Sequence, residues 1–510
     1  MQSYSQLSSK QTGILLVSIL VVALCGIAYE LIISTVSSYL LGNSVYQFSL
    51  TIGFFMFSMG VGSYLSKLLS DKNLIQNFIT VEIAVSLVGG VCSLLLLMSF
   101  PLVRALYETV MFSLIFIIGA LVGMEIPILT GILSAKHSTR DSIANVMSLD
   151  YIGALIGSVA FPLLLLPQLG LLRSSFAIGL INILTALTNI YFFRKYLNSP
   201  RLLTYISLAI LLMLIAFTVY GTRISSYAEQ HLYFDQVIFK KQTPYQRIVV
   251  TKSHGTNEHR LYIDGHIQFS SRDEYRYHES LVHPLLAIQG KKENVLVLGG
   301  GDGLAVREIL KYGDVKLIHL VDIDPEMTRI SKRLYMLSML NEKSLENPKL
   351  SVYNQDAFSF INQPGILYDR VIIDMPDPHN EAINKLYSKE FYTMIRRRMS
   401  EEGLVVSQSS SPFFTHKTFW AIEKTLGAVF DDTLSYHVTI PSFGVWGFNM
   451  ARVNKQIPRD FKFNVSTKYL NDKIMQAAMI FGKDTSKVEV PVNTIMEPKL
   501  YQLYLDDLKI

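Results

Sequence analysis

Four aspartates follow the ends of successive apolar segments in the C-terminal part of the chain. Asp302, Asp322, Asp356 and Asp374 each come shortly after a short run of apolar residues. In an open parallel sheet, the carboxyl ends of the strands line one ligand crevice. Four carboxylates that converge on one crevice repel one another unless the ligand brings positive charge. The spacing therefore predicts a site that binds a cation.

Aspartates also cap helix N-termini, which gives each of these residues a simpler interpretation. We expect that interpretation to hold for Asp324. Asp374, in contrast, is followed by Pro376 and Pro378, which predict a stiff loop instead of the start of a helix. We therefore expect Asp374 to belong to the site.

The segments that would position these acids predict an α/β domain with a doubly wound, Rossmann-like sheet. Residues 294–299 form an apolar strand that ends in the glycine cluster Gly299–Gly303, and 304–312 have a helical pattern. A strand, a glycine-rich turn and a helix form the first unit of a nucleotide-binding sheet. Asp322 lies about 20 residues past the glycines, where an acid commonly binds a ribose hydroxyl. Further strands are expected at 316–321, 350–353, 370–373 and 404–407.

A small β-rich segment precedes this sheet. Strands are expected at 233–240, 247–252 and 260–263, and Asp264-Gly265 is a hairpin turn signal. We interpret residues 231–270 as an N-terminal β-strand subdomain and residues 271–510 as the Rossmann-like catalytic domain.

Residues 1–221 differ in composition from the rest of the chain. They hold 10 Lys and Arg and 7 Asp and Glu, so about 8% are charged, against about 24% of the remaining 289 residues. Soluble domains average about 25%. A wholly soluble protein is therefore excluded, and so is a purely membrane-embedded one. The net charges of the two parts, +3 and +2, do not indicate a basic surface that would bind nucleic acid.

A bundle of seven transmembrane helices is expected in residues 1–221, because one span needs roughly 20 apolar residues. The pairs Gly119/Gly123 and Gly153/Gly157 have the spacing that lets membrane helices approach closely. We expect a multi-pass protein of the inner (plasma) membrane, with membrane lipid as a partner. The expected spans are 13–40, 45–68, 77–100, 108–134, 147–167, 172–193 and 202–220.

Three acids, Glu30, Glu125 and Asp150, lie within or at the edges of these spans. A charge at the bilayer centre costs about 2.5–3.5 kcal/mol, so we expect all three to face the bundle interior. They are open to two interpretations. One is a path for a substrate or a proton, and the other is hydrogen bonding between helices.

The distribution of basic residues conflicts with the expected chemistry. Lys and Arg concentrate in the loops after spans two, four and six, which the positive-inside rule places in the cytoplasm. With seven spans, the C-terminal part would then lie outside the cell. Because the substrates implied below are cytosolic metabolites, we expect a cytoplasmic catalytic domain.

Seven segments of the C-terminal part resemble the membrane-fused form of the spermidine synthase (polyamine aminopropyltransferase) family. The resemblance implies transfer of an aminopropyl group from decarboxylated S-adenosylmethionine to a diamine, with putrescine as the usual acceptor. The products would be spermidine and 5′-methylthioadenosine. We also expect a homodimer or homotetramer. The matching segments are Tyr245-Gln246, 261–269, 272–279, 299–303, 321–324, 374–378 and 386–392.

The resemblance assigns roles that agree with a cation site, since the donor is a sulfonium and the acceptor a dication. Asp374 is the implied general base, and Tyr277 orients the amine beside it. No cofactor or metal is implied, and no metal-ligand spacing appears among the histidines or the two cysteines. The implied donor-binding residues are Gln246, Gly299, Gly301, Asp322, Asp356 and Ala357, and the implied polyamine-binding residues are His278, Asp302 and Asp377.

The acceptor side departs from the family pattern. The common Asp-Ser-Ser-Asp-Pro is here Asp-Met-Pro-Asp-Pro, starting at Asp374, and the following Gly-Pro is His379-Asn380. Phe443 stands where soluble members tend to have a tyrosine that contacts the acceptor. The sequence therefore supports the donor side of the site better than the acceptor side.

Two other functions remain open at this point. One is a methyltransferase that uses ordinary S-adenosylmethionine, although Asp302 would lie unfavourably beside the carboxylate of that donor. The other is a polyamine transporter or sensor whose C-terminal domain binds without turnover. The combination of Asp374 and Tyr277 favours catalysis.

Overall fold

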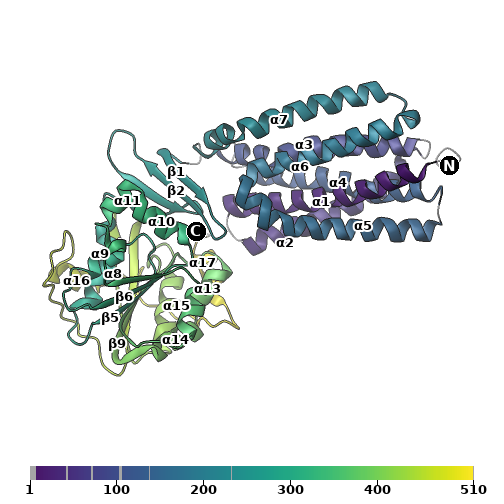
Figure 1. Cartoon of the computed structure of the whole chain (residues 1–510). Helices are drawn as coiled ribbons and strands as arrows, with labels where there is room; N and C mark the ends of the chain where they lie inside the picture. The colour runs from purple at the N-terminus through teal and green to yellow at the C-terminus, as the bar shows by residue number, and fades with distance from the viewer. Residues whose placement is uncertain are drawn as a thin grey trace. The chain divides into compact units, whose positions relative to one another are not determined.

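A computed structural model of the chain describes residues 7–41, 44–70, 73–102, 106–136, 138–230 and 233–508. The chain forms two compact units, Met1–Phe234 and Asp235–Ile510, which are coloured purple to teal and teal to yellow in Figure 1. Each unit is described by itself.

The first unit consists of long apolar helices (Figure 1). Among the described residues, six helical runs are long and apolar enough to cross a membrane, where seven spans were expected. The difference arises at 139–196, where two expected spans join in one run of 58 residues. The run contains a π-helical turn, Phe161–Leu165, and is broken at Gly170, which has φ +72°. The helices are α1 (Ser9–Leu41), α2 (Ser44–Leu65), α3 (Leu74–Leu102), α4 (Tyr107–Leu133), α5 (Thr139–Ala160), α6 (Leu166–Phe193) and α7 (Pro200–Gln230).

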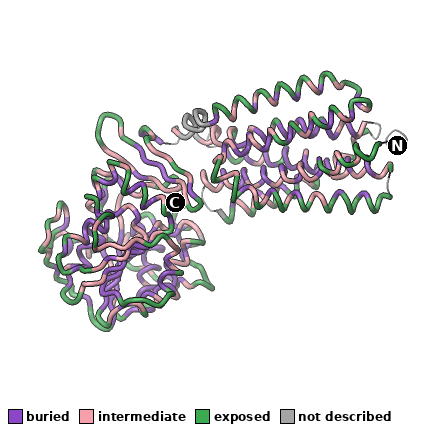
Figure 2. The backbone as a smooth tube through the Cα atoms, in the orientation of Figure 1, coloured by how far each residue is buried: buried purple, intermediate pink, exposed green. Residues whose placement is uncertain are grey.

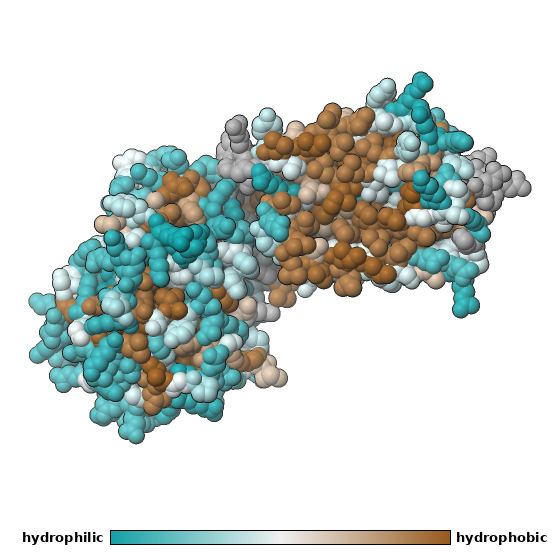
Figure 3. All heavy atoms as spheres, in the orientation of Figure 1, coloured by the Kyte–Doolittle hydropathy of each residue, from teal (hydrophilic) through white to brown (hydrophobic). Residues whose placement is uncertain are grey.

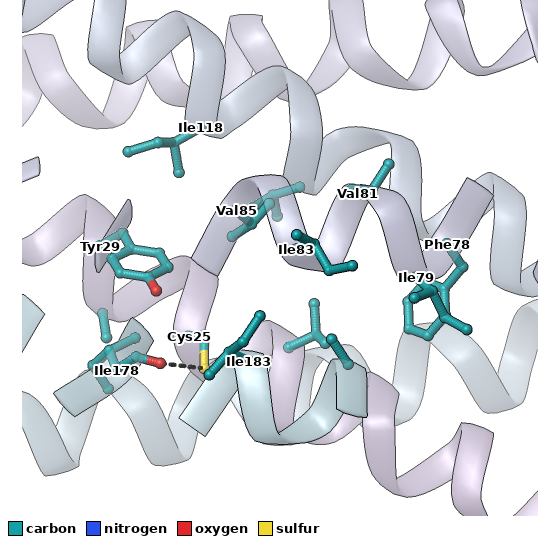
Figure 4. Close-up of a cluster of buried hydrophobic side chains, with 14 of the residues drawn as sticks. Cys25, Tyr29, Phe78, Ile79, Val81, Ile83, Val85, Ile118, Ile178 and Ile183 are labelled. Carbon is teal, nitrogen blue, oxygen red and sulfur yellow. Dashed lines mark hydrogen bonds between the residues drawn. The ribbon is translucent and has the colours of Figure 1, made fainter. Parts of the chain in front are cut away.

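The helical unit is apolar both outside and inside. Hydrophobic residues cover most of its visible surface (Figure 3), and Met56, Leu155 and Leu212 are each at least 64% exposed. In the interior, the Cys25 thiol donates a hydrogen bond to the Ile178 carbonyl oxygen at 3.8 Å, amid aliphatic side chains (Figure 4). Exposed aliphatic side chains are favourable in lipid and costly in water.

The two glycine pairs lie where helix backbones touch. A Cβ on Gly123 would lie 2.1 Å from the carbonyl oxygen of Met59, and one on Gly153 would lie 2.2 Å from that of Leu20. These contacts join α4 to α2 and α5 to α1. The spacing therefore marks close helix contacts, as expected for small residues in membrane bundles.

The three acids selected from the sequence are buried or half-buried in the helical unit. Glu30 and Glu125 are buried, and Asp150 is half-buried. Sequence analysis overlooked a fourth acid, Glu82 on α3, which is fully buried and an electrostatic neighbour of Glu125. Among the described residues, no cationic side chain pairs with Glu82 or Glu125.

The second unit begins with a four-stranded antiparallel sheet in the order β1-β2-β3-β4. Its strands are β1 (Gln236–Gln242), β2 (Arg247–Lys252), β3 (His259–Ile263) and β4 (His266–Ser270). Asp264 and Gly265, with φ 49° and 83°, make the predicted turn between β3 and β4. The apolar face of this sheet packs on helices α10 and α11, which lie beside it in Figure 1. The sequence prediction did not include β4.

A seven-stranded sheet in the order β10-β11-β9-β8-β5-β6-β7 forms the centre of the second unit. Strands β5 to β9 are parallel, whereas β11 pairs antiparallel with β9 and β10. The five parallel strands match the five predicted ones, but the hairpin of β10 and β11 was not predicted. The strands are β5 (Asn294–Gly299), β6 (Leu317–Val321), β7 (Leu350–Tyr353), β8 (Tyr368–Asp374), β9 (Met399–Gln408), β10 (Asp432–Ile440) and β11 (Gly444–Arg452).

Helices cover both faces of this sheet, so its central strands are buried on both sides (Figure 2). In β5, Val295 and Val297 contact one core while Leu296 and Leu298 contact the other. This explains why a parallel strand reads as a continuous apolar run. The helices are α8 (Glu274–Ala287), α9 (Leu304–Ile309), α10 (Pro325–Arg333), α11 (Tyr335–Leu340), α12 (Ala357–Asn362), α13 (Glu381–Asn384), α14 (Lys389–Arg397), α15 (His416–Gly427), α16 (Asp472–Ala478) and α17 (Lys499–Asp507).

Candidate active site

The candidate site lies where the strand order reverses. From β5 the chain proceeds through β6 and β7 on one side and returns through β8 and β9 on the other. Gly299, which ends β5, lies in register with Asp374, which ends β8. Ligands of doubly wound sheets bind at this switch point, outside the carboxyl ends of the strands.

The glycine loop is compact because side chains would not fit there. Gly299 has φ +85°, and a Cβ on it would lie 2.0 Å from the Asp374 carbonyl oxygen. A Cβ on Gly301 would lie 2.5 Å from Asp322 Oδ2, which instead accepts a 3.0 Å hydrogen bond from the Gly301 N–H. The loop thereby brings Asp322 and Asp374 to the two sides of one short turn.

Helix α8 supplies two adjacent side chains to this turn. The Tyr277 hydroxyl donates a hydrogen bond to Asp374 Oδ1 at 2.7 Å. Burial, together with the charge of Asp374, raises the pKa of Tyr277 well above its usual value, so the phenol keeps its proton. The ring of His278 lies 5.0 Å from that of Tyr277, centroid to centroid, and His278 is buried as well.

Burial raises the pKa of each carboxyl group of the site, and the charge of Asp302 adds to this effect at Asp374 and Asp322. Burial and the charge of Asp302 raise the pKa of Asp374 to about 6, although His278 and the Tyr277 hydroxyl act in the opposite direction. Burial also raises the pKa of Asp302. Burial raises the pKa of Asp322 to about 6 despite its hydrogen bonds from backbone N–H groups, including that of Gly301. A cationic ligand would relieve this mutual repulsion.

Gln246 reaches the site through Asp324. Its Nε2 donates to Asp324 Oδ2 at 2.9 Å, and the Thr243 hydroxyl donates to the same oxygen at 2.9 Å. Asp324 also caps α10 by accepting from the Glu326 N–H, which confirms its expected capping role. The strand pair β1–β2 is thereby tied to the end of β6, and Gln246 is placed beside Asp322, whose Oδ1 accepts from the Asp324 N–H at 2.9 Å.

Asp356 and Ala357 lie at the end of β7, at the start of α12. Asp356 accepts hydrogen bonds from the Ser359 N–H at 2.8 Å and from Lys385 Nζ at 3.0 Å. These partners outweigh the effect of burial and lower the pKa of Asp356. Its carboxylate therefore forms an ion pair with Lys385. Ala357 is buried beneath it.

Asp377 lies in the loop after β8 and contacts residues that sequence analysis did not select. Gln408 Nε2 lies 3.4 Å from Asp377 Oδ1, and Ser410 and Tyr504 also hydrogen-bond this carboxylate. Burial nevertheless raises the pKa of Asp377 to about 6. Gln408 is the last residue of β9 and Ser410 lies two residues beyond it, so the strand-end rule that selected the acids could have found both. Tyr504, on α17, carried no such signal.

Aromatic rings lie beside Tyr277 and in the loop after β8. Phe443 lies 6.3 Å from the ring of Tyr277, and the rings of His266 and His379 lie 5.0 Å apart. Burial and the neighbouring His266 lower the pKa of His379 to about 4, so this ring is neutral at pH 7. In the part of the chain that the structure describes, no group of three or more His, Cys, Asp or Glu could hold a metal ion. The arrangement suits an amine that loses a proton to a buried carboxylate.

A family model and several relatives match this chain, and all of them belong to one family. Residues 274–463 match the model of the spermine/spermidine synthase domain. The chain is 43% identical to a polyamine aminopropyltransferase of Leptospira interrogans, over 96% of this chain and 97% of that relative. It is 40% identical to a polyamine aminopropyltransferase of Oceanobacillus iheyensis, over 97% of each. A polyamine aminopropyltransferase of Ralstonia nicotianae is 39% identical, over 98% of this chain and 99% of that relative.

Proposed function

The chain belongs to the polyamine aminopropyltransferase family, and from this premise we propose that its crevice transfers an aminopropyl group from decarboxylated S-adenosylmethionine to a diamine. Putrescine is the proposed acceptor, and spermidine and 5′-methylthioadenosine are the products. The observation that carries the proposal is the hydrogen bond from Tyr277 to Asp374 at the strand-order switch point.

The reaction is a displacement at carbon. The acceptor nitrogen attacks the aminopropyl carbon bonded to the sulfonium, the C–S bond breaks, and its electron pair returns sulfur to a neutral thioether. The attacking amine must be unprotonated, and Asp374 accepts its proton. Its pKa of about 6 suits a base that acts near neutral pH. Tyr277 keeps Asp374 oriented, and the crevice holds nitrogen and carbon in line.

The remaining site residues are proposed to bind the two substrates. Asp322 would accept the ribose hydroxyls, with Gly299 and Gly301 allowing close approach and Gln246 beside the donor. Asp356 and Ala357 would border the adenine. Asp302 and Asp377 would bind the ammonium groups of the polyamine, and His278 would border its chain. The reaction needs no cofactor, because the sulfonium activates the carbon to which it is bonded and departs as the neutral thioether 5′-methylthioadenosine.

Product formation tests this function. Purified full-length protein is incubated with decarboxylated S-adenosylmethionine and a panel of di- and polyamines, and 5′-methylthioadenosine is quantified. Formation that depends on one amine supports the proposal. Conversion of ordinary S-adenosylmethionine to its demethylated product would instead indicate a methyltransferase. Absence of product with every amine would refute aminopropyl transfer.

We also propose that the helical unit is embedded in the plasma membrane and that the catalytic unit faces the cytoplasm. The six apolar runs and the exposed aliphatic surface support membrane insertion. The distribution of Lys and Arg opposes the orientation, so a direct test is needed. Single cysteines on the catalytic surface of a Cys25→Ser, Cys92→Ser variant should resist a membrane-impermeant thiol reagent in intact cells. Labelling in intact cells would refute a cytoplasmic catalytic unit. Assembly as a homodimer or homotetramer stays a prediction.

A further inference from the structure

A buried row of charges lies directly behind the acids of the site. Arg307 on α9 donates from Nη1 to Glu274 Oε1 and from Nη2 to Glu274 Oε2, each at 2.9 Å. Glu274 Oε2 also lies 2.9 Å from His278 Nδ1. The three residues are at most 6% exposed. A guanidinium, a carboxylate and an imidazole therefore follow one another out of contact with water.

The contacts of His278 decide which of its ring atoms can titrate. Nδ1 faces two oxygens, the Glu274 backbone carbonyl at 2.8 Å and the Glu274 carboxylate at 2.9 Å. A carbonyl oxygen can only accept, so Nδ1 carries hydrogen in both charge states of the ring. Charging the ring therefore means adding a proton at Nε2.

The other charged groups that act on this ring are mostly acidic. Glu274 comes from α8, Asp302 from the glycine loop and Asp374 from the end of β8. The charge of Arg307 lies beyond Glu274 and is offset further by Glu308, whose Oε1 accepts from Arg307 Nε at 2.8 Å. The ring is thus the positive centre of a group of carboxylates.

We propose that Glu274, held in place by Arg307, is a positioning residue that keeps His278 as an imidazolium beside Asp302 and Asp374. This role rests on the proposed function of the same site. Glu274 does not touch the reacting groups itself and acts only through His278.

The electrostatics of the site support this role. Burial alone would lower the pKa of His278, but the hydrogen bond and charge of Glu274 outweigh it and raise the pKa to about 9. The resulting imidazolium in turn lowers the pKa values of Asp374 and Asp302, which burial raises. The general base therefore stays ionised at neutral pH. A fixed cation in the site also favours the neutral, nucleophilic form of the attacking amine.

Glu308 provides a matched control for Glu274. Both carboxylates are buried and bind Arg307, but Glu308 contacts His283 and Lys311 in place of His278. Glu274→Gln and Glu308→Gln should therefore weaken the same buried network to a similar degree. Only the first removes the negative charge that faces His278.

The experiment is an NMR titration of ring-labelled histidine in the full-length protein in detergent. The His278 signal is identified by its loss in His278→Gln. In the wild type it should titrate above about pH 8. In Glu274→Gln the midpoint should fall by about 1–3 pH units, the usual effect of losing an adjacent opposite charge. Glu308→Gln should leave it unchanged. The acid limb of kcat/KM should move to higher pH in Glu274→Gln only, whereas a purely structural loss would lower activity equally at every pH.

Three outcomes overturn the proposal. The first is a wild-type midpoint near the ordinary histidine value of about 6.5, which requires no variant to fold. The second is an unchanged midpoint in Glu274→Gln, and the third is an equal fall in Glu308→Gln. Failure to form 5′-methylthioadenosine would refute the proposed function and leave the titration intact, so the two failures are distinguishable.

Discussion

Tyr277 and Asp374 are 97 residues apart in the sequence, and the tyrosine hydroxyl donates to Asp374 Oδ1 at 2.7 Å. The bond joins helix α8 to the end of strand β8. Because burial keeps the phenol protonated, the Tyr277 hydroxyl is a fixed hydrogen-bond donor that orients the Asp374 carboxylate. The pair is therefore one hydrogen-bonded unit, and we expect it to act as one.

Substitutions of this pair should not be additive. Asp374→Asn removes the proposed base, so kcat should fall about 10²–10⁴-fold. Tyr277→Phe removes only the orienting hydroxyl and should lower kcat less, with little change in the KM for the donor. The double variant should be no slower than Asp374→Asn alone, because residues that act as a unit are not additive. Release of 5′-methylthioadenosine measures all three, with the exposed Tyr335→Phe as control. Additive losses would show independent roles.

The rate should depend on pH through the same carboxylate. The base must be ionised to accept a proton, and burial with the charge of Asp302 raises the pKa of Asp374 to about 6. We therefore expect kcat/KM to fall tenfold per pH unit below about pH 6. The profile is measured with saturating donor over about pH 4–9. A rate that stays constant down to about pH 4, the ordinary range of aspartate, would contradict this assignment.

The parallel part of the sheet could be predicted because its central strands are buried on both faces and its strands end in polar turns. Asn294–Gly299 shows both features, and the acids after it follow the same rule. Strands β10 and β11 contain both buried and partly exposed residues. They are also not followed by a glycine-rich turn of the kind that marks a crossover to a parallel strand. Their pairing depends on contacts with β9 and α15 that local pattern does not contain.

The partners of the acids could not be predicted, because they depend on distant segments. The pairing of Asp356 with Lys385 and of Glu274 with Arg307 joins residues about 30 positions apart on different elements. Glu82 was missed for another reason. It lies in the middle of an otherwise apolar run, and only the structure shows that Glu125 faces it.

Asp322 should control the affinity for the donor. Its Oδ2 is held by the Gly301 N–H and its Oδ1 by the Asp324 N–H, which leaves the carboxylate fixed at the end of β6. Asp322→Asn should raise the KM for the donor about 10–100-fold, which is the expected effect of losing one or two hydrogen bonds to a charged group. The KM for the diamine should change little. Initial-rate kinetics with each substrate varied in turn measure both, with the exposed Glu489→Gln as control. Equal rises in both KM values would contradict a donor-specific role.

Gly123 should be intolerant of even one methyl group. A Cβ there would lie 2.1 Å from the Met59 carbonyl oxygen, so α2 and α4 would have to separate. Gly123→Ala should lower the thermal midpoint by several degrees, because overpacking costs about 1–3 kcal/mol. On α2, a Cβ on Gly60 meets nothing within 4 Å, so Gly60→Ala should leave the midpoint unchanged or raise it through helix propensity. Far-UV circular dichroism in detergent follows both. A similar fall in both variants would contradict a specific contact.

Phe443→Tyr should improve binding of the acceptor. The Phe443 ring is half-buried, lies 6.3 Å from the Tyr277 ring and packs edge-on against Trp446 at 5.0 Å. A hydroxyl there would place an additional hydrogen-bond acceptor beside the amine that Tyr277 and Asp374 bind. One such bond contributes about 0.5–1.5 kcal/mol, so the KM for the diamine should fall about 2–10-fold. The KM for the donor should not change, because the donor contacts proposed here come from the loop before β2 and from the ends of β5, β6 and β7. Phe413→Tyr, in an exposed loop, is the control. A rise in the diamine KM would show that Phe443 contacts the acceptor as an apolar wall and that the hydroxyl obstructs it.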